Sequence, residues 1–189
     1  MKCALLIIDM QRFFFRENPA ALRCGFVDNC RKLLKWGRDT CVPIVHVHTV
    51  YESDKSDWPE AWKSEGPDVW CNHLVKGVES SQFVDGLEPL PHEAVVRKTR
   101  FSAFFNTTLQ SVLIKHGVDT LVVSGYSCDV CIRFTCVDAY NFGYHIYLAS
   151  DCVESFKVPR KEACVYLQWL TNLRLVTSDE LQGMLPPPG

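Results

Sequence analysis

The stretch DTLVVSGYSCDVCIRFTCVDAYNFGYHIYLAS, residues 119–150, decides the fold class of this chain. It opens with a continuous apolar run that ends at Gly125, and it closes with a second apolar run over residues 144–150. Between them, residues 131–142 repeat apolar side chains at helical spacing. Continuous apolar runs are typical of strands that are covered on both faces. The order strand, helix, strand therefore predicts a right-handed βαβ unit with parallel strands.

The same alternation of apolar runs and amphipathic stretches extends toward both ends of the chain. The segments are predicted strands at residues 4–8, 43–50, 94–98 and 173–177, and predicted helices at residues 22–37, 107–116 and 160–171. Repeated βαβ units place helices on both faces of one sheet. The sequence thus predicts an α/β fold, a three-layer α/β/α sandwich with a mainly parallel, Rossmann-like, six-stranded sheet, in a single domain over residues 1–189.

Residues 51–92 interrupt this alternation. They contain Trp58, Trp62 and Trp70 together with several prolines and acids. A long insertion of this kind in a compact domain is usually a functional loop. The segment is therefore expected either to form a lid over a site or to be a surface excursion whose tryptophans pack on the body.

Composition argues against several classes of function. The 189 residues carry a formal net charge of only -2, and no basic block resembles the footprint of a nucleic-acid or lipid-surface binder. The N-terminal apolar run is too short for a membrane span, and Asp9 interrupts it where a secretory signal would continue. The ten cysteines are then expected to be reduced thiols of a cytoplasmic protein. The expected partner is a small-molecule substrate, with no nucleic acid and no membrane.

Three predicted strands end in groups that can carry chemistry. Asp9 and Lys98 each follow an apolar run, and a turn from Gly125 to Cys131 follows a third. Sites in open parallel sheets form beyond the carboxyl ends of the strands, so an acid, an amine and a thiol are expected to meet there. Cys131 lies at the start of a predicted helix, where N–H groups and the helix dipole favour a thiolate and could hold an oxyanion. Gln11 closely follows the acid and is expected to orient it.

The chain resembles a known family in three segments. These segments match, in order and spacing, the signatures of the isochorismatase-like cysteine hydrolases, which include nicotinamidases and N-carbamoylsarcosine amidohydrolase. They are IIDMQ (7–11), KTRFSAFFNTTL (98–109) and GYSCDVCIRFTCVDAYNFGYHI (125–146). The resemblance implies a catalytic triad of Asp9, Lys98 and Cys131. It also implies hydrolysis of an amide or carbamoyl C–N bond of a small molecule through a thioester.

The resemblance gives each residue of the triad a role. Asp9 takes the thiol proton as general base and later returns it to the leaving amine, Lys98 lowers the pKa of the thiol, and Cys131 attacks the carbonyl carbon. The family also has a cis peptide bond that corresponds to Tyr126–Ser127, and this bond aims the N–H of Ser127, with that of Cys131, at an oxyanion. The aromatic residues that match pocket-wall positions of the family are Phe14, Phe101, Phe105 and Tyr126.

The chain departs from the nicotinamidases where they bind a divalent metal. Those relatives carry an Asp and two or more His after the second strand, whereas this chain has TVYES at residues 49–53. His46 and His48 lie on one strand face, and without a matching carboxylate they are expected to be structural or pocket-edge residues. No metal and no cofactor is therefore predicted. Gln82 stands in GVESSQ (77–82) where an acid is common in amidases, which predicts a changed pocket or a loop that only positions the lid.

Other interpretations stay open. Cys128-x-x-Cys131 has the spacing of a thioredoxin-like redox motif, and with Cys136 it offers part of a zinc site for which no second ligand pair is spaced. A vinyl-ether hydrolase of the isochorismatase type and a non-catalytic binding protein are alternatives on the same fold. Relatives commonly form dimers or tetramers, so a homo-oligomer is expected. Thr135 and Asp138 of the third segment are expected to have structural roles.

Overall fold

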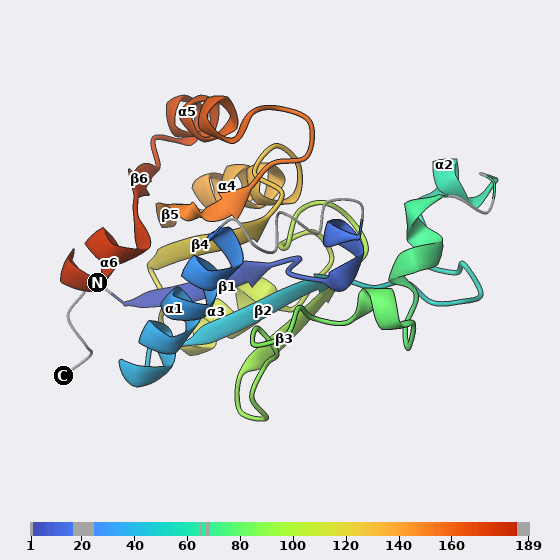
Figure 1. The fold of residues 1–189 in the computed structure, drawn as a ribbon, viewed down its shortest axis with the longest axis horizontal. Helices are drawn as coiled ribbons and strands as arrows, with labels where there is room; N and C mark the ends of the chain where they lie inside the picture. Colours follow the sequence, from blue (N-terminus) through green and yellow to red (C-terminus); the bar gives the residue numbers. More distant parts are fainter. Residues whose placement is uncertain (1, 17–24, 65, 67–68, 185–189) are drawn as a thin grey trace.

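The computed structural model describes residues 2–16, 25–64, 66 and 69–184. In this part of the chain, six strands form one sheet in the order β3-β2-β1-β4-β5-β6, and each neighbouring pair is parallel (Figure 1). The predicted six-stranded sheet is confirmed. The strands are β1 (Cys3–Ile8), β2 (Ile44–Thr49), β3 (Ala94–Lys98), β4 (Thr120–Tyr126), β5 (His145–Glu154) and β6 (Arg174–Val176).

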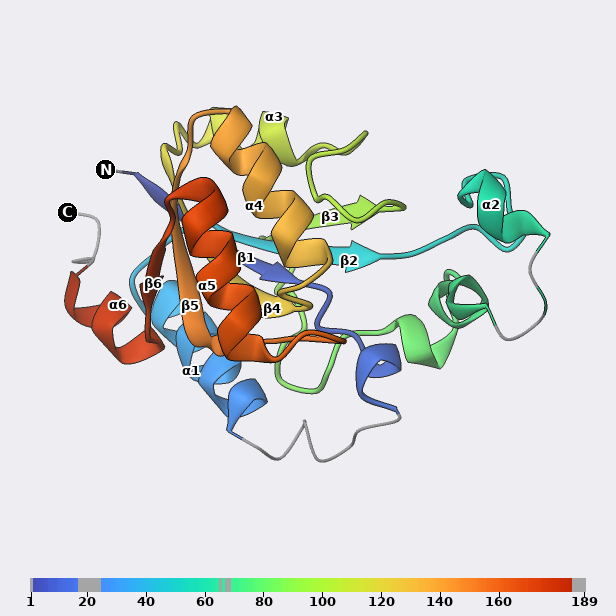
Figure 2. The same cartoon turned by 90° about the horizontal axis from the view of Figure 1, so that it is seen from above.

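Helices cover both faces of the sheet and complete three layers (Figure 1 and Figure 2). α1 and α6 pack on one face, whereas α3, α4 and α5 pack on the other, as the predicted sandwich requires. None of the described helices has the length and apolar character needed to cross a bilayer. The helices are α1 (Phe26–Asp39), α2 (Glu60–Lys63), α3 (Leu109–Lys115), α4 (Cys131–Asn141), α5 (Arg160–Thr171) and α6 (Ser178–Met184).

The central strand β1 shows why the apolar runs are continuous. Leu5 and Ile7 belong to the core cluster under α1, whereas Leu6 and Ile8 belong to the cluster under α4, and all four are buried. Successive residues of a strand face opposite sides, so a strand between two helical layers needs apolar residues at every position. Burying each such aliphatic side chain contributes roughly 1.5–3 kcal/mol of transfer free energy. β1 therefore holds the two helical layers together.

The strand order reverses between β1 and β4, and this point positions the site. β1, β2 and β3 follow one another toward one edge of the sheet, and β4, β5 and β6 follow one another toward the other edge. A crevice forms beyond the carboxyl ends of the strands at such a switch point. Gly125, the last residue but one of β4, lies there with φ +117°, and a Cβ at this position would lie 2.0 Å from the carbonyl oxygen of Ile8. Only glycine allows the two strands to approach this closely.

Some boundaries differ from the predictions. β5 continues to Glu154, beyond the predicted end at residue 150. The sequence did not predict α6, because this helix of seven residues buries little apolar surface besides Leu181 and shows no clear helical repeat. The predicted helix at residues 22–37 begins at Phe26 in the structure, and residues 22–24 lie outside the described part.

The described part of residues 51–82 in the insertion lies beyond the carboxyl ends of the strands (Figure 2), and the segment that follows returns along α1, where Arg38 donates to the carbonyl of Glu88. Besides α2 it contains two short 3-10 helices, η2 (Trp70–Leu74) and η3 (Glu79–Ser81). Tyr51 and Trp58 are buried in a small cluster of their own, together with Phe13 from the 3-10 helix η1 (Arg12–Phe15). Trp58 thus packs as expected for a surface excursion, while other parts of the insertion reach the site described next.

Candidate active site

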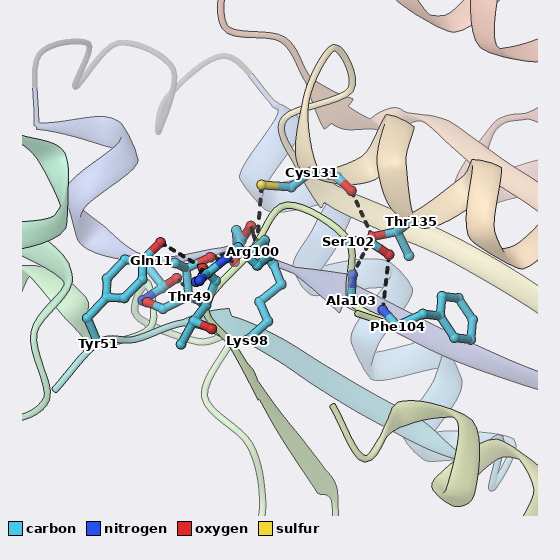
Figure 3. Close-up of polar contacts among 12 residues, drawn as sticks. Gln11, Thr49, Tyr51, Lys98, Arg100, Ser102, Ala103, Phe104, Cys131 and Thr135 are labelled. Atoms are coloured by element: carbon cyan, nitrogen blue, oxygen red, sulfur yellow. Dashed lines mark hydrogen bonds and ion pairs between the residues drawn. The ribbon is translucent and has the colours of Figure 1, made fainter. Parts of the chain in front are cut away.

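Three strand ends bring an acid, an amine and a thiol into one cluster. Asp9 follows β1, Lys98 ends β3, and Cys131 begins α4 after β4. The Nζ atom of Lys98 lies 2.8 Å from Oδ2 of Asp9 and 3.3 Å from Sγ of Cys131 (Figure 3). The side chains of Lys98 and Asp9 are only 1% and 0% exposed. Asp9 also has a left-handed backbone with φ +51°, a strained conformation that is common at functional positions.

Thr49 and Gln11 hold this cluster in place. The Thr49 hydroxyl donates to Oδ1 of Asp9 at 2.9 Å and accepts from Nζ of Lys98 at 2.6 Å. The Gln11 side chain donates to the carbonyl of Thr49 and accepts from its N–H, both at 2.9 Å, and it also donates to the carbonyl of Ser81 at 2.7 Å. Gln11 therefore orients Asp9 through Thr49, and it ties the insertion to the end of β2.

The local charges keep Lys98 protonated. Burial lowers the pKa of Lys98, but the carboxylate of Asp9 and the sulfur of Cys131 raise it by more, so the net shift is upward. Its ammonium also donates to the carbonyl of Arg100 at 3.2 Å. A buried ammonium is tolerated only when it is paired and hydrogen-bonded in this way. Lys98 is thus a fixed positive charge beside the sulfur.

The surroundings of Cys131 raise the pKa of its thiol, in the opposite direction to the lowering expected at a helix start. Burial raises the pKa of Cys131 first, the charge of Asp9 raises it further, and Lys98 offsets only part of this increase. Nζ of Lys98 lies between the two groups, 2.8 Å from Oδ2 of Asp9 and 3.3 Å from the sulfur of Cys131. Desolvation and the charge of Asp9 therefore outweigh the opposing effect of Lys98. The arrangement suits transfer of the proton from sulfur to Asp9 during attack, rather than a standing thiolate.

The loop between β4 and α4 carries the two residues expected to supply an oxyanion hole. The expected cis peptide bond between Tyr126 and Ser127 is present. The carbonyl of Ser127 accepts from the N–H of Val130 at 3.1 Å and from the N–H of Ile132 at 3.0 Å, which leads the loop directly into α4. Ser127 and Cys131 both line the same cavity.

This cavity has a volume of about 360 Å³, which suits a small molecule. Most of its wall is aromatic. Arg16 is the one charged side chain among the described residues of the wall, and its guanidinium carbon lies 3.8 Å from the ring centroid of Phe13. The lining residues are Phe13, Phe14, Arg16, Thr49, Trp62, Trp70, Phe101, Tyr126, Ser127, Val130, Cys131 and Phe156.

Three of the four aromatic residues expected in the pocket wall line this cavity. Phe14 and Tyr126 contact each other, with ring centroids 5.2 Å apart, and Phe101 completes this part of the wall. Phe105 was expected there as well, but it does not line the cavity, and 53% of its surface is exposed. The loop after β3 is held at Ala103, so Phe105 lies past the held segment and faces solvent.

Thr135 and Asp138 of α4 hold that loop. The hydroxyl of Thr135 donates to the carbonyl of Cys131 at 2.7 Å and accepts from the N–H of Ala103 at 3.0 Å (Figure 3). The carboxylate of Asp138 accepts a hydrogen bond from the hydroxyl of Ser102. The structural roles expected for both residues are confirmed, and Thr135 joins the loop directly to the nucleophile's own backbone.

Sequence reasoning missed several residues of the site. Trp62 and Trp70 reach the cavity from the insertion and contact each other edge to face, with centroids 4.5 Å apart. Tryptophans in a polar insertion were the available signal, but the sequence did not show which of them face inward. Thr49 was noted only as part of a stretch that lacks metal ligands, and its contact with Asp9 depends on the pairing of β1 with β2.

His46 and His48 do not line the cavity that contains Cys131. Nε2 of His46 lies 2.9 Å from the carboxylate of Glu93, a partner that the sequence did not reveal. His48 stacks on Phe83, with ring centroids 5.3 Å apart. Burial lowers the pKa of both histidines, so both are neutral at pH 7. Within the described ranges, no group of three or more His, Cys, Asp or Glu side chains is placed to hold a metal ion.

Comparisons with known proteins agree with one another. Residues 3–172 match the model of the isochorismatase domain. The phenazine biosynthesis protein PhzD of Pseudomonas fluorescens is 31% identical over 180 residues, which cover 95% of this chain and 84% of that protein. The maleamate amidohydrolase of Pseudomonas putida is 30% identical over 155 residues, which cover 80% of this chain and 72% of that protein. The crystal structure of N-carbamoylsarcosine amidase from Thermoplasma acidophilum superposes with a TM-score of 0.81 at 28% identity, covering 95% of this chain and 98% of that one.

Proposed function

The chain belongs to the isochorismatase family of hydrolases, and we propose that it cleaves the C–N bond of a small amide or carbamoyl compound through a thioester on Cys131. One observation carries this proposal. Cys131 lines a largely apolar cavity, and its sulfur lies 3.3 Å from the buried cation Lys98, which is paired at 2.8 Å with a buried base, Asp9. A nucleophile, a base and a fixed cation at one cavity wall form an arrangement suited to acyl transfer.

The acylation step follows from these contacts. Asp9 takes the proton of the Cys131 thiol as the sulfur attacks the carbonyl carbon, and the C–S bond forms while the carbonyl oxygen gains negative charge. The N–H groups of Ser127 and Cys131 stabilise that charge. Asp9, now protonated, gives its proton to the leaving nitrogen as the C–N bond breaks. Lys98 stabilises the negative charge that passes between sulfur and carboxylate.

Deacylation uses the same base. Asp9, again ionised, takes a proton from a water molecule that attacks the thioester carbonyl, and the C–S bond breaks. The proton returns to sulfur, so Cys131 ends as the neutral thiol with which the cycle began. The raised pKa of Cys131 favours this return.

A vinyl-ether hydrolase of the isochorismatase type is the alternative reaction. Such a reaction protonates a carbon atom and needs an acid but no nucleophilic thiol. The contact of Lys98 with both Cys131 and Asp9 places a thiol beside a base and a cation, which favours covalent chemistry instead. The same contacts weigh against a binding protein that has lost turnover, because burying an acid and an amine costs stability that a binding role would not require.

The cavity wall supports a flat substrate that carries an anionic group. Trp62 and Tyr126 are among the aromatic side chains of the wall, and such surfaces suit a planar molecule. Arg16 supplies the positive charge of the wall, and a guanidinium binds a carboxylate well. One similar protein is a maleamate amidohydrolase, by its name an enzyme that acts on an amide.

The test is ammonia release from matched pairs of amides that differ only in a carboxylate. We expect turnover of the anionic member to exceed that of the neutral one, by about tenfold in kcat/KM, and Arg16→Gln should remove the preference.

Rapid acid quenching followed by mass spectrometry should show an acyl adduct on the wild-type chain and none on Cys131→Ala. If the variant released ammonia as fast as the wild type, or the adduct lay elsewhere, the thioester mechanism would be wrong.

We further propose that the protein works in the cytoplasm, without a metal, as a homodimer or homotetramer. Large apolar side chains on the outer face of α5 support assembly, with Trp169 76% and Val165 52% exposed. Light scattering should give a mass above one chain, and Trp169→Glu should shift it toward the monomer.

Activity that survives prolonged treatment with EDTA would support the metal-free proposal, and a loss restored by added Zn²⁺ would contradict it.

A further inference from the structure

The Cys-x-x-Cys motif does not form the pair that its spacing predicts. Cys131 faces the cavity, whereas Cys128 points away from it toward Cys164 on α5. The two sulfur atoms of Cys128 and Cys164 lie 3.6 Å apart, and the residues are only 1% and 4% exposed. The two thiols that are close to each other therefore come from different segments of the chain, 36 positions apart.

We propose that Cys128 and Cys164 are a redox-sensitive pair that a hydroperoxide converts to a disulfide, which ties the oxyanion loop to α5. This inference goes beyond hydrolysis and does not depend on which substrate is cleaved. A disulfide has a sulfur–sulfur distance of about 2.05 Å, so the pair must contract by about 1.5 Å. One side of the pair is the loop at residues 127–130, and the other is α5.

The two thiols differ in a way that sets the order of reaction. The hydrogen bond between the two thiols lowers the pKa of Cys164 by more than burial raises it, and the nearby charge of Arg160 lowers it further. The same hydrogen bond, together with burial, raises the pKa of Cys128. Cys131, by contrast, has a raised pKa. Since the thiolate is the reactive form, Cys164 should react with a hydroperoxide before the nucleophile does.

The chemistry balances in two steps. The thiolate of Cys164 attacks one peroxide oxygen, an S–O bond forms, the O–O bond breaks, and the departing oxygen takes a proton to leave as water or an alcohol. Cys128 then loses its proton and attacks the sulfur of Cys164. The S–S bond forms, the S–O bond breaks, and hydroxide leaves as water with that proton. Two thiols are oxidised by two electrons in total, and one hydroperoxide is reduced.

The pair is coupled to the active site through the backbone. Ser127 and Cys131, which flank this loop, both line the cavity. Within the loop, the N–H of Cys128 donates to the carbonyl of Glu154 at 2.8 Å. The carboxylate of Asp129 accepts from the backbone N–H groups that lead into α5, those of Phe156, Lys157 and Val158, at 2.9, 2.7 and 3.0 Å. These hydrogen bonds join the loop to the segment that leads into α5. Formation of the disulfide would draw the loop toward α5 and thereby displace the N–H groups of Ser127 and Cys131.

A second pair of neighbouring cysteines provides a matched control. The thiol of Cys30 donates to the backbone carbonyl of Cys152 at 3.3 Å. Burial raises the pKa of Cys30. This pair should stay reduced under conditions that oxidise Cys128 and Cys164, although it is equally buried.

The experiment treats the full chain with stoichiometric hydrogen peroxide, blocks remaining thiols with N-ethylmaleimide, and maps peptides without reduction. A Cys131→Ser background is used in parallel, because Cys128 and Cys131 lie in one tryptic peptide. We expect a cross-link between residues 128 and 164 in both backgrounds, its absence in Cys164→Ser, and no change in Cys30→Ser. No cross-link in the Cys131→Ser chain, or a cross-link that survives Cys164→Ser, overturns the proposed pair.

Activity then tests the coupling separately. A displacement of about 1 Å in catalytic groups costs on the order of 100-fold in rate, so the cross-linked wild-type chain should lose at least about tenfold in kcat and regain it with dithiothreitol. Full activity of the cross-linked chain would refute the coupling to the oxyanion loop. The cross-link is detected by mass spectrometry and needs no activity assay. The proposal of a disulfide between Cys128 and Cys164 is therefore tested independently of the proposed amide hydrolysis.

Discussion

Among the described residues, the buried carboxylates of Asp9 and Glu93 both pair with cations, and only Asp9 lies in the candidate active-site cluster. Asp9 contacts Lys98 at the carboxyl ends of the strands, and its side chain is fully buried. Glu93 contacts Arg38 of α1 and His46 of β2, with its own side chain 3% exposed. Residue types and burial therefore do not separate a reactive cluster from a structural one.

The difference lies in what completes each cluster. Glu93 accepts two hydrogen bonds from Arg38, at 2.7 and 2.9 Å, another from the N–H of Leu90 at 2.8 Å, and it contacts His46. None of these partners of Glu93 lines the cavity that contains Cys131. Asp9 instead faces a thiol whose sulfur lines a cavity. A buried charge becomes chemically useful when one of its partners can release a proton toward a space that a substrate can enter.

Replacing the nucleophile should break the active-site cluster with the largest effect. Cys131→Ala removes the sulfur atom that we propose forms the thioester, so kcat should fall by about 10⁵-fold in the ammonia assay. Cys136→Ala is the control, since it removes another buried thiol from the same helix outside the cavity. That control should cost stability but keep kcat. Retention of activity by Cys131→Ala would show that the two clusters do not differ as described.

Replacing Glu93 should break the structural cluster instead. Glu93→Gln leaves Arg38 without its carboxylate, so the free energy of unfolding should fall by about 3 kcal/mol, as measured by urea denaturation. The folded variant should keep its kcat within about a factor of two, because the cavity is built by other residues. A loss of kcat as large as that of Cys131→Ala would mean that Glu93 serves the reaction.

Acid should weaken the same structural cluster in a defined order. Burial raises the pKa of Glu93, but Arg38, the N–H of Leu90 and His46 outweigh it and lower the pKa from 4.5 to about 2. The unfolded chain therefore binds this proton first as pH falls, and stability is lost between pH 4.5 and about 2, by about 2 kcal/mol after allowance for solvent screening. His46, whose pKa burial lowers from 6.5, adds a loss that begins below pH 6.5.

Denaturation curves from pH 7 to pH 3 would check this order. Wild-type stability should decline below pH 6.5 and decline more steeply below pH 4.5. Glu93→Gln should lack the second, steeper part. An identical slope in both proteins below pH 4.5 would assign the acid sensitivity to other carboxylates.

The smallest expected effect sharpens the boundary of the cavity. Phe101 lines it and Phe105 does not, although both belong to the same segment. Phe101→Ala should raise KM for the preferred amide by about tenfold, which corresponds to about 1.4 kcal/mol of lost contact. Phe105→Ala should leave KM unchanged. Equal effects from the two variants would mean that the loop after β3 closes further over the substrate.

Much of the fold could be predicted because each strand between two helical layers is apolar at every position. That pattern marks strands such as β1 and β4 without any knowledge of their neighbours. It also predicts that Asp9 and Lys98 lie at one edge, since parallel strands end on the same side. The pattern does not extend to the insertion, where Trp58 turns into a small core while Trp62 lines the cavity.

The amino-acid sequence by itself determined the order of the six strands and of the helices that connect them, the edge of the sheet where Asp9 and Lys98 meet, and the cysteine that begins α4. The tertiary structure alone decided which groups touch: Thr49 on Asp9, Glu93 on His46, and Cys128 on Cys164 rather than on Cys131. It also decided that Cys131 rests as a thiol, because desolvation depends on what surrounds the sulfur. Periodicity is local and can be read along the chain, whereas contacts and burial arise only when distant segments pack.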